Sequence, residues 1–459
     1  MATVQAKVDA STFQGCNRPL GKRIKVVGMG SCGVDYLASV AAYPRPDEKL
    51  RTEKLETQGG GNCANALTAA ARLGLYPTLV TKIGGDGLGD GILSELHADG
   101  IDTTHVLRAA GHPSPFTYII VDRQGGTRTC IHTPGAPLEP GEMTAALLEG
   151  ALAGAALVYF DGRLTEAAVL LAREARRRGI PVLVEAERLR PGLELLLAEA
   201  DYVVTSAHFP QDWTGEANLA DAVLATAERL PAARWVVTTM GTRGSVLLER
   251  PPAANGNGNG NGNGAGGALR HVALHDVMES ELEPRLRALV AEVEAEAVCV
   301  AETGQVIGAG HTASTDGYVQ LKYSAPRDRA QEAAAAAAVA AERAAALNAD
   351  SGRGAAYAAG NSSAGAASGA AGNGLVARVT LATIATLPKE AVVDTTGAGD
   401  SFIGSILYGL CTGMSLPGCM RLGAVVAAAK CTQLGARPGL PTRCNLSQDL
   451  LHEVVDKTA

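Results

Sequence analysis

The sequence lacks the features of a membrane-spanning, disulfide-bonded or nucleic-acid-binding protein. No apolar run approaches the length that crosses a bilayer. The nine cysteines include no CxxC pair, which is typical of a reducing compartment rather than of a disulfide framework. The net charge is −7 and the longest basic run is Arg176–Arg178, so we expect neither a membrane nor a nucleic acid as partner.

The N-terminus also lacks a secretion signal. Residues 1–22 form a predicted N-terminal extension that has no apolar core and contains Asp9. We therefore expect a cytoplasmic protein, with a plastid as the alternative location. Hydrophobic residues make up 46% of the 459 positions, which is enough to bury a substantial core in one large or two medium domains.

One heptad carries the strongest chemical signal, Asp394-Thr395-Thr396-Gly397-Ala398-Gly399-Asp400. It lies between a strand-like stretch at 391–393 and a helical stretch at 402–410. A helix start has unpaired backbone N–H groups and the positive end of the helix dipole, and the two glycines let an anion approach closely. Asp400 beside an anion site is a candidate general base for an incoming nucleophile. The alternative is that Asp400 only favours the helix N-terminus.

A second glycine-rich turn follows the apolar segment at 24–27. Its glycines match the spacing of a dinucleotide-binding turn, which needs a helix directly after it. Prolines at 44 and 46 interrupt that helix, so we discount an oxidoreductase of the Rossmann type. We expect instead that the turn presents Asp35 at the carboxyl end of a strand, where open α/β sheets bind ligands. The glycines in question are Gly28, Gly30 and Gly33.

Three more glycines open the helical run after Gln58. Asn62 and Asn65 follow them, lie three residues apart and share a helix face, where their amides can donate and accept hydrogen bonds. Neutral amides at a site of close approach suit hydroxyl groups. An ordinary helix N-cap is the alternative for Asn62.

Elsewhere, apolar strand-like segments and helical segments alternate with short connections. This pattern predicts an α/β fold with a central, mostly parallel sheet covered by helices on both faces. The regions at about 36–58 and 113–133 contain short strands, which we expect to form a small sheet that stands off the main domain as a lid and excludes water. Gly241 and Gly244, after the strand 235–239, allow another close approach to a ligand.

The region 251–375 differs from the rest in composition. An Asn-Gly alternation at 255–264, an Ala run at 333–346 and a Gly/Ala/Ser/Asn-rich stretch at 362–374 cannot bury a core. We predict a low-complexity, largely flexible insertion between two late strands of one domain, whose two parts are 23–250 and 376–459.

An island inside this region is the exception. A helical pattern opens at Pro284 and runs to Val293, and the segments 298–300 and 318–323 are strand-like. We expect a short bridge between Arg250 and Val376 to leave the domain folded unless the apolar stripe of this helix packs against the core.

Two of these segments resemble signatures of the PfkB-type, or ribokinase-like, carbohydrate kinases. Gly60–Asn65 is similar to the early glycine-asparagine signature, and Asp394–Asp400 is similar to the late DTTGAGD signature. The resemblance covers about residues 24–250 and 376–443 and implies a ribokinase-like fold. Within the family, Asp161–Arg163 and Val184–Arg188 resemble ketohexokinase, whereas Gly435–Pro441 resembles the C-terminal loop of ribokinase.

The resemblance implies roles for particular residues. Asp400 would be the general base, and Gly397, Ala398 and Gly399 would form the anion hole for the transferring phosphoryl group. The residues implied to bind the sugar are Asp35, Gly61, Asn62, Asn65 and Asp400. Those implied to bind ATP are Arg128, Thr239, Gly241, Gly244, Gly397 and Gly399. A monovalent cation such as potassium would bind at Asp394, Thr396 and Gly435 and support the anion hole.

ATP and magnesium are the cofactors that the resemblance implies, and the sequence departs from the family at two related places. The NxxE motif of the magnesium-phosphate network has no counterpart, since Thr205-Ser206-Ala207-His208-Phe209 stands in its position. Gly439 replaces a serine of the ribokinase cation loop.

We therefore expect an ATP-dependent kinase that phosphorylates a hydroxyl of a small sugar, a ketose or a pentose, and a homodimer formed through the lid. A nucleoside kinase of the same fold would need an aromatic side chain to stack on a purine, and the chain has only five Phe and two Trp. A non-catalytic kinase-like interaction protein would have lost the base or the glycines, and this chain has both.

Overall fold

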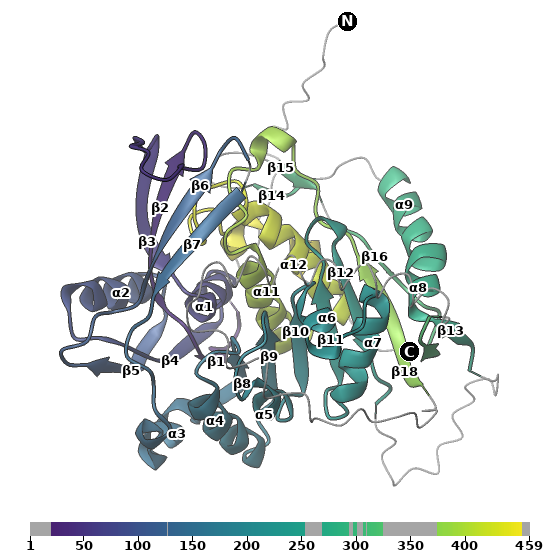
Figure 1. The fold of residues 1–459 in the computed structure, drawn as a ribbon. Coiled ribbons are helices and arrows are strands. Elements are labelled where there is room, and N and C mark those ends of the chain that lie inside the picture. The colour runs from purple at the N-terminus through teal and green to yellow at the C-terminus, as the bar shows by residue number, and fades with distance from the viewer. Residues whose placement is uncertain are drawn as a thin grey trace, which may run out of the picture.

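The computed structural model describes residues 20–125, 127–252, 269–292, 297–300, 306–308, 310–324 and 374–451. In these residues a large sheet is covered by helices on both faces, and a smaller sheet stands off one end of it (Figure 1). This arrangement confirms the predicted α/β fold with a mostly parallel central sheet and a separate small sheet.

The large sheet has twelve strands and a parallel centre. Every neighbouring pair from β11 to β5 is parallel, whereas β12 and β18 run antiparallel to their neighbours. In spatial order the strands are β13 (His271–Ala273), β17 (Val319–Lys322), β18 (Leu375–Ala382), β12 (Ser245–Glu249), β11 (Trp235–Thr239), β10 (Tyr202–Thr205), β9 (Val182–Ala186), β8 (Ala155–Phe160), β1 (Lys25–Met29), β4 (Tyr76–Gly84) and β5 (Asp102–Ala109), with β16 (Thr312–Ser314) also paired to β18.

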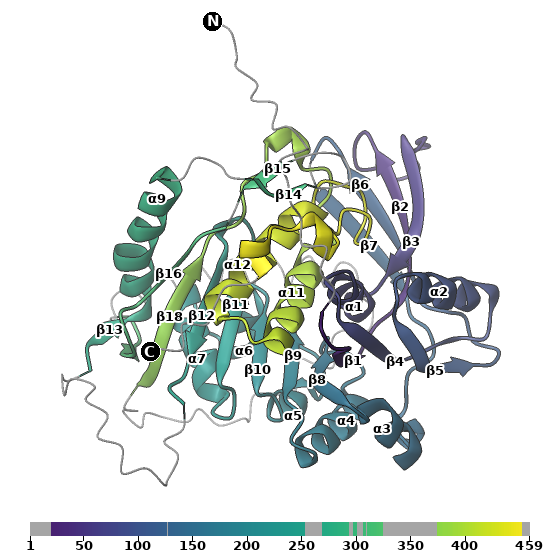
Figure 2. The same cartoon turned by 180° about the vertical axis from the view of Figure 1, so that it is seen from behind.

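Helices cover the two faces of this sheet. On the first face, α11 (Ala398–Thr412) packs between α1 (Asn62–Arg72) and α12 (Leu416–Lys430), as Figure 2 shows. The second face carries α3 (Ala145–Leu152), α4 (Thr165–Arg177), α5 (Leu193–Leu197) and α7 (Leu219–Arg229). The remaining helical elements are α2 (Gly87–Ala98), η2 (Pro140–Glu142), α6 (Phe209–Thr214), η3 (Gly241–Arg243), α8 (Leu274–Asp276), η4 (Val277–Leu282), α9 (Glu283–Glu292), η5 (Lys389–Ala391), η6 (Arg443–Asn445) and α13 (Gln448–Leu451).

The small sheet forms the lid and has four strands. In spatial order these are β3 (Lys54–Gly60), β2 (Gly33–Val40), β6 (Phe116–Asp122) and β7 (Thr127–Thr133). Both regions that were predicted to form a lid thus contribute a pair of strands. Leu37 and Ile119 on its inner face pack against Leu434, which joins the lid to the loop after α12.

The insertion contributes to the large sheet where it is described. β16 and β17 pair in succession along one edge of β18. The predicted island is confirmed as α9, as β17 and as β14 (Ala297–Val300), which pairs with β15 (Val306–Gly308). The low-complexity stretches at 255–264 and 333–346, and all of 362–374 except Gly374, lie outside the described residues, so their predicted flexibility stays a prediction.

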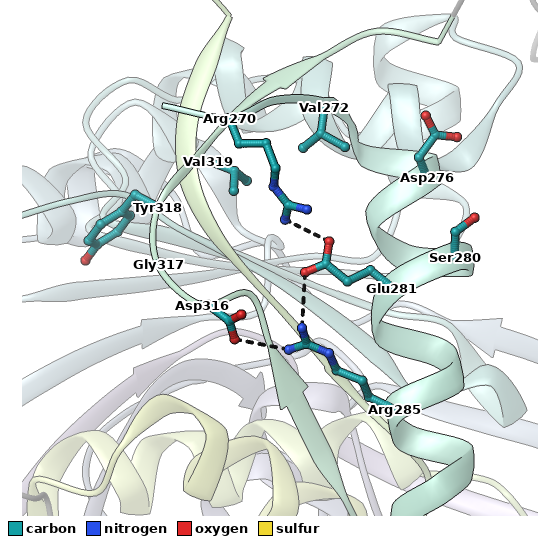
Figure 3. Close-up of a pocket in the computed structure, with 10 residues that line it drawn as sticks. All are labelled: Arg270, Val272, Asp276, Ser280, Glu281, Arg285, Asp316, Gly317, Tyr318 and Val319. Atoms are coloured by element: carbon teal, nitrogen blue, oxygen red, sulfur yellow. Dashed lines mark hydrogen bonds and ion pairs between the residues drawn. The ribbon is translucent and has the colours of Figure 1, made fainter. Parts of the chain in front are cut away.

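A surface hollow of about 670 Å³ lies among the elements of the insertion (Figure 3). Four of the charged side chains that line it are paired with one another. Glu281 forms ion pairs with Arg270 at 2.7 Å and with Arg285 at 3.8 Å, and Arg285 pairs with Asp316 at 3.2 Å. These four residues are called the insertion charge cluster below.

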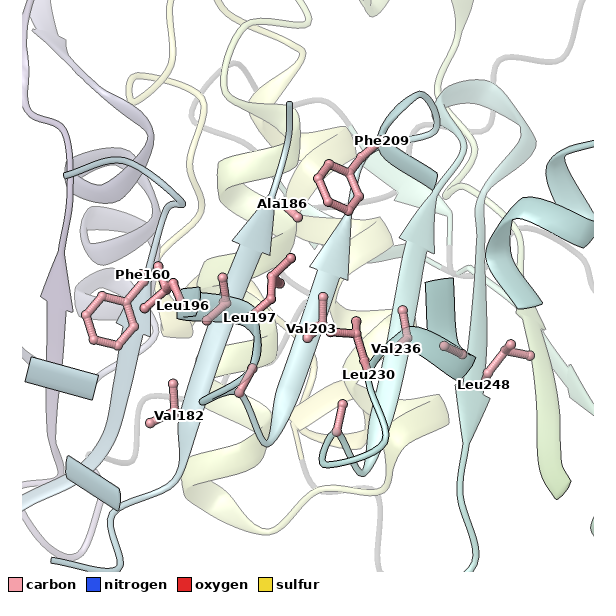
Figure 4. Packing of buried hydrophobic residues seen from close by; sticks show 14 of the residues in the cluster. Phe160, Val182, Ala186, Leu196, Leu197, Val203, Phe209, Leu230, Val236 and Leu248 are labelled. Atoms are coloured by element: carbon pink, nitrogen blue, oxygen red, sulfur yellow. The ribbon is translucent and has the colours of Figure 1, made fainter. Parts of the chain in front are cut away.

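Burial of both faces explains why the central strands are apolar along their whole length. In β8, Leu157 and Tyr159 point to the first face, whereas Val158 and Phe160 point to the second, and all are buried. Figure 4 shows the second face, where side chains of successive strands pack against Leu196 and Leu197 of α5. The same cluster includes Leu274, Val277, Leu282 and Leu286 from the insertion.

One predicted element is wrong, the strand at 391–393. Ala391 ends η5, and Val392 and Val393 are 44% and 53% exposed. The N–H of Val393 donates to the carbonyl of Cys431 at 2.8 Å, so the end of α12 holds this segment in place of a neighbouring strand. The last strand of the sheet before the heptad is β18.

Candidate active site

The heptad 394–400 forms a turn that leads into α11. Gly397 has a φ of 76°, and a Cβ on it would lie 2.7 Å from the Cβ of Ala436, so both conformation and packing require glycine. A Cβ on Gly399 would meet no atom within 4 Å, so this residue faces open space. The start of α11 can therefore receive an anion at the N–H groups of its first turn, where the N–H of Ala398 also donates to the carbonyl of Thr395 at 3.2 Å.

Asp400 is a buried carboxylate in the first turn of α11, with 8% of its surface exposed. Its Oδ2 accepts a hydrogen bond of 2.9 Å from Nδ2 of Asn65 on α1. Burial raises the pKa of Asp400 to about 7; the Asn65 hydrogen bond opposes this rise, and the negative charges of Glu187 and Asp161 add to it. A carboxylate with this pKa can accept a proton near neutral pH.

Asn65 links Asp400 to a buried arginine in the loop after α12. Its Oδ1 accepts a hydrogen bond of 3.0 Å from Nε of Arg437. Arg437 is 4% exposed and also donates to Glu95 at 2.9 Å and to the carbonyl of Gly60 at 3.4 Å. Because each end of the Asn65 amide has its own partner, the amide has one favourable orientation. Arg437 had no predicted role.

Asp394 lies in the same heptad and is also buried, but its carboxylate is fully engaged. Oδ1 accepts hydrogen bonds from the N–H and the hydroxyl of Thr396 at 2.9 and 2.8 Å, and Oδ2 accepts one from the N–H of Gly435 at 2.8 Å. Burial acts to raise the pKa of Asp394, yet the ammonium of Lys430 and these hydrogen bonds bring it below its ordinary value. Asp394 is thus a structural charge, and Asp400 is the aspartate of the heptad that can exchange a proton.

Arg128 on β7 reaches from the lid to the heptad. Its Nη1 donates to the hydroxyl of Thr395 at 2.6 Å. A cavity of about 1150 Å³ lies here, lined by lid residues, by Val392–Thr395 and by Thr432–Leu434. The lid therefore already contacts the turn that would bind an anion.

Asp35 lies on β2, on the face of the lid that points to the main domain. It is 8% exposed, and a Cβ on Gly60 would lie within 2.4 Å of its carboxylate, so the glycine leaves room for this side chain. Burial raises the pKa of Asp35 to about 6, while the charge of Arg437 and a hydrogen bond with Thr117 lower it. Asp35 and Asn65 thus both lie beside Arg437.

Gly61 and Asn62 form the start of α1. Gly61 has a φ of 91°, and a Cβ on it would lie 2.6 Å from Cα of Cys32, so packing against the neighbouring turn accounts for this glycine. The side chain of Asn62 is not the N-cap, because Gly61 holds that position; its Nδ2 donates to Glu187 at 3.4 Å instead.

Two buried acids that had no predicted role lie at the same edge of the sheet. Asp161 follows β8 and accepts hydrogen bonds from the N–H and the hydroxyl of Ser31 at 2.7 and 2.6 Å. Glu185 on β9 accepts one from the Tyr159 hydroxyl at 2.7 Å, and burial raises the pKa of Glu185 well above its ordinary value. A charged residue at the carboxyl end of an apolar strand was the signal that could have identified both.

The dinucleotide-like glycines of the first turn serve packing. A Cβ added to Gly28 would lie 2.7 Å from Leu67, and one added to Gly30 would lie 2.2 Å from Asp161. A Cβ added to Gly33 would lie 2.7 Å from the carbonyl of Pro115. A strand, β2, follows them where a nucleotide-binding turn would have a helix. These distances agree with the rejection of the Rossmann hypothesis.

Three more of the predicted ATP-binding residues lie at the end of β11 and in the turn that follows it. Thr239 donates to the carbonyl of Thr205 at 3.2 Å. A Cβ on Gly244 would lie 1.9 Å from the carbonyl of Ala382, so β18 dictates this glycine, whereas Gly241 faces open space. Of these residues, Gly241 has the surroundings that a ligand could approach.

The two buried cysteines in the first turn and in α1 are not activated thiols. Burial raises the pKa of the Cys32 thiol to about 12 and that of Cys63 well above its ordinary value, so both stay protonated. The cysteines of the described residues are free thiols. In the same part of the chain, no helix is long and apolar enough to cross a bilayer.

Comparison with known proteins gives one consistent family. The profile described as pfkB family carbohydrate kinase matches residues 23–263 and 358–443. Ribokinase of Staphylococcus aureus (strain COL) is 37% identical over 102 residues, which are 22% of this chain and 34% of that protein. The chain matches only 42% and 51% of the next two curated relatives, so these alignments span about half of a relative's length or less.

Solved structures show the same fold. Arabidopsis thaliana ribokinase complexed with ribose and ATP superposes with a TM-score of 0.58 at 17% identity, over 94% of this chain and 99% of that one. Burkholderia thailandensis nucleoside kinase in complex with inosine superposes with a TM-score of 0.54 at 14% identity, over 93% and 96% of the two chains. At these identities the likeness concerns the fold.

Proposed function

The chain belongs to the pfkB family of carbohydrate kinases, and we propose that it transfers the γ-phosphoryl group of ATP to a hydroxyl of a small sugar, a ketose or a pentose. The observation that carries the proposal is the position of Asp400. A buried carboxylate with a pKa of about 7 lies at the start of α11, beside a turn that is open to an anion.

The geometry supports an in-line transfer with Asp400 as general base. Asp35 and Asn65 would bind sugar hydroxyls, together with Gly61 and Asn62 at the start of α1. As the acceptor oxygen forms its bond to the γ-phosphorus, the bond from that phosphorus to the β,γ-bridging oxygen breaks and ADP leaves. Asp400 takes the hydroxyl proton, and the N–H groups of Gly397, Ala398 and Gly399 stabilise the transferring group.

Arg128 has the reach to bind the phosphates of ATP. It is exposed and already touches Thr395, so closing the lid over ATP would bring its charge toward the start of α11. Thr239 and Gly241 would lie along the nucleotide, with Gly241 in open space. Gly244 supports this loop through its packing on β18.

The site fits a magnesium ion that is held mainly by phosphates and water. The described residues contain no group of three or more His, Cys, Asp or Glu that could hold a metal alone. Magnesium in kinases commonly uses one or two carboxylates plus phosphate oxygens. Glu187, whose side chain is 29% exposed and whose charge acts on Asp400, would be that carboxylate, and it would exchange its ion pairs with Arg163, Arg188 and Arg190 for the ion. When bound, the ion neutralises phosphate charge.

The lid favours a sugar over a nucleoside. Its aromatic side chains Tyr36, Phe116 and Tyr118 pack on one another, with ring centroids 5.2 to 5.9 Å apart. Tyr36 and Asp35 are adjacent on β2, so their side chains point to opposite faces, and Tyr36 faces away from the site. No Tyr or Phe ring of the described lid residues therefore lies on the Asp35 face; the ring on that face is the imidazole of His132, whose Nδ1 lies 3.2 Å from the Thr117 hydroxyl.

The outer lid face supports the expected homodimer. Leu55, Tyr118 and Ile131 are 63%, 51% and 53% exposed there, which is unusual for large apolar side chains. A second lid is a partner of matching chemistry, and Ile131→Lys should lower the mass measured by analytical ultracentrifugation from dimer to monomer. A cytoplasmic location, with a plastid as alternative, remains a prediction.

A coupled assay of ADP release tests the proposed function. Purified protein is mixed with ATP, magnesium and one acceptor at a time: ribose, fructose, other ketoses and nucleosides. We expect acceptor-dependent ADP release with a ketose or a pentose that is lost in Asp400→Asn. Release with nucleosides alone would establish the nucleoside kinase. The absence of release with every acceptor, from protein that binds ATP, would favour a non-catalytic interaction protein.

A further inference from the structure

Lys430 occupies the region where a monovalent cation was predicted. It is the last residue of α12, and its side chain is completely buried. Nζ donates to the backbone carbonyl of Asp394 at 2.6 Å and to that of Gln433 at 3.5 Å, and it lies 4.0 Å from Oδ2 of Asp394. An ammonium group thus lies under the loop that leads into the anion-binding turn.

The oxygen atoms left around Asp394 do not fit a potassium ion. Such an ion needs several oxygen ligands, but Oδ1 and Oδ2 of Asp394 already accept hydrogen bonds from Thr396 and Gly435. Gly435 presents its N–H group to Asp394, and an N–H group repels a cation. The carbonyl of Asp394 is taken by Lys430. The residues predicted to bind the ion therefore bind one another and this lysine.

We propose that the Lys430 ammonium replaces the monovalent cation of this site and makes the enzyme independent of potassium. The inference rests on the proposed kinase function, because the charge would act on the phosphoryl group that binds at 397–399. It deepens that function by naming the fixed positive charge behind the anion hole. Lys430 does not touch the reacting atoms, so it is a positioning residue.

The pKa of Lys430 lies below its ordinary value, because burial lowers it more than the carboxylate of Asp394 raises it. The two backbone carbonyls and the carboxylate of Asp394 around Nζ favour the charged form. The ammonium also lies at the C-terminus of α12, where the helix dipole favours a positive charge. An uncharged side chain of similar length would leave the carbonyl of Asp394 without its donor and the carboxylate without its countercharge.

Two variants separate charge from packing. Lys430→Ala removes the charge and leaves room for an ion, whereas Lys430→Met removes the charge but fills much of the space. Turnover and the melting temperature without substrates are measured with chloride salts of sodium, potassium, ammonium or tetramethylammonium at about 0.1 M, so that ionic strength is constant. ADP affinity is measured by calorimetry under the same conditions.

We expect the turnover of the wild type to differ by less than about twofold between the salts. Lys430→Ala should lose about tenfold or more in turnover in sodium, because one element of anion stabilisation is gone, and potassium or ammonium should restore much of it. The same ions should raise the melting temperature of Lys430→Ala and leave that of the wild type unchanged. Lys430→Met should be slow in every salt.

Clear outcomes overturn the proposal. Activation of the wild type by potassium of more than about threefold would show that an ion still binds. If Lys430→Ala folds but neither its turnover nor its melting temperature changes with potassium or ammonium, Lys430 serves packing alone. If Lys430→Ala does not fold, the wild-type salt series still decides. If the wild type phosphorylates no acceptor, the melting series tests the cation independently of the kinase function.

Discussion

Two groups of charged residues in this chain are built in opposite ways. Around Asp400, the partners come from distant segments: Asn65 from α1 and Arg437 from the loop after α12 are buried, and Glu95 from α2, whose side chain is 37% exposed, pairs with Arg437. In the insertion charge cluster three of the four side chains are well exposed, with Arg270 at 55%, Arg285 at 44% and Asp316 at 86% exposure, while Glu281 is 19% exposed.

This difference decides where a substitution should matter. A buried polar atom that loses its partner cannot turn to water, which costs about 1–3 kcal/mol for each group. An exposed ion pair exchanges its partner for water and salt, so it contributes about 0–1 kcal/mol. Side chains with similar chemistry should therefore give large effects at the first group and small ones at the second.

Asp400→Asn should give the largest effect. Asn keeps the size of the side chain but cannot accept the proton, so we expect turnover to fall by about 10²–10⁴-fold. Asp316→Asn, the matched change in the insertion charge cluster, should leave turnover unchanged. Turnover of Asp400→Asn above about a tenth of the wild-type value would refute the general-base role and remove the contrast between the groups.

The same variant has a predicted pH signature. The fold raises the pKa of Asp400 from 3.8 to about 7, so the folded chain binds this proton more tightly and its stability falls as the pH rises between these values. Wild-type turnover should rise with pH through about 7. Asp400→Asn should melt at a higher temperature than the wild type above pH 7, and this gain should disappear toward pH 4; equal melting curves at every pH would contradict the raised pKa.

Arg437→Met should be the most destabilising single change at the active site. It removes the donor to Oδ1 of Asn65 and to the carbonyl of Gly60, and a buried polar group that loses its partner costs about 1–3 kcal/mol. Glu95 is 37% exposed and still accepts a hydrogen bond from the N–H of Gly59 at 2.9 Å, so the loss of its ion pair adds little. Urea unfolding measures the change, and turnover at permissive urea concentrations shows whether Asp400 has lost its orientation. A loss below about 1 kcal/mol would place this group in the same class as surface pairs.

Sequence predicted those parts of this architecture that rest on local pattern. Tyr202–Thr205 and Trp235–Thr239 are strands because short apolar runs between turns are buried on both faces. The heptad 394–400 and the asparagines of α1 were identifiable because each forms a local turn with glycine. The strand prediction for 391–393 was wrong because Val392 and Val393 line a cavity and do not join the sheet.

The missing parts depend on contacts between distant segments. Arg437 bonds to Asn65 across 372 positions and to Glu95 across 342 positions, and no local pattern encodes such pairs. In the sequence, Lys430 is likewise an ordinary basic residue at the end of a helix. Only its contact with Asp394 in the structure indicates a role at the predicted cation site. The sequence shows Asp161 and Glu185 as acids at the ends of apolar strands, but it does not show that they lie near Asp400.

Asp35→Ala should affect substrate binding more than stability. If Asp35 binds sugar hydroxyls, the substitution leaves those hydroxyls without a partner and should weaken the binding free energy of the sugar by about 1–3 kcal/mol. The dissociation constant of ATP should change by less than about twofold. Calorimetric titration of each ligand measures both affinities. Equal loss of the two would show that the substitution disturbs the lid as a whole and that Asp35 does not belong to the sugar site.

A short turn in place of residues 325–373 should stabilise the chain slightly. Leu321 pairs with Leu375 across β17 and β18, so the ends of this segment are neighbours in an antiparallel ladder. A turn of about four residues lowers the entropy cost of closure by roughly 2 kcal/mol on the logarithmic scaling.

The bridge from Arg250 to Val376 is the contrasting variant. It also removes β16, β17 and the buried side chains of Leu274, Val277, Leu282 and Leu286. We therefore now expect it to lower the melting temperature, in contrast to the expectation from sequence. A bridge variant as stable as the chain with the short turn would show that the described insertion adds nothing to the core.

Arg285→Met should give the smallest effect and so completes the comparison. The substitution removes the pairs with Asp316 and Glu281 but keeps most of the apolar stem. Asp316 is 86% exposed to water, and Glu281, which is 19% exposed, keeps its ion pair with Arg270 at 2.7 Å. We expect a change below about 1 kcal/mol in urea unfolding at low salt, and a smaller one at about 0.5 M salt, where exposed charges are screened. A loss that approaches that of Arg437→Met, or one that salt does not reduce, would show that this surface cluster is coupled to the core beneath it. The division between buried and exposed charges would then fail at the insertion, because α9 would depend on its ion pairs as the active site depends on Arg437.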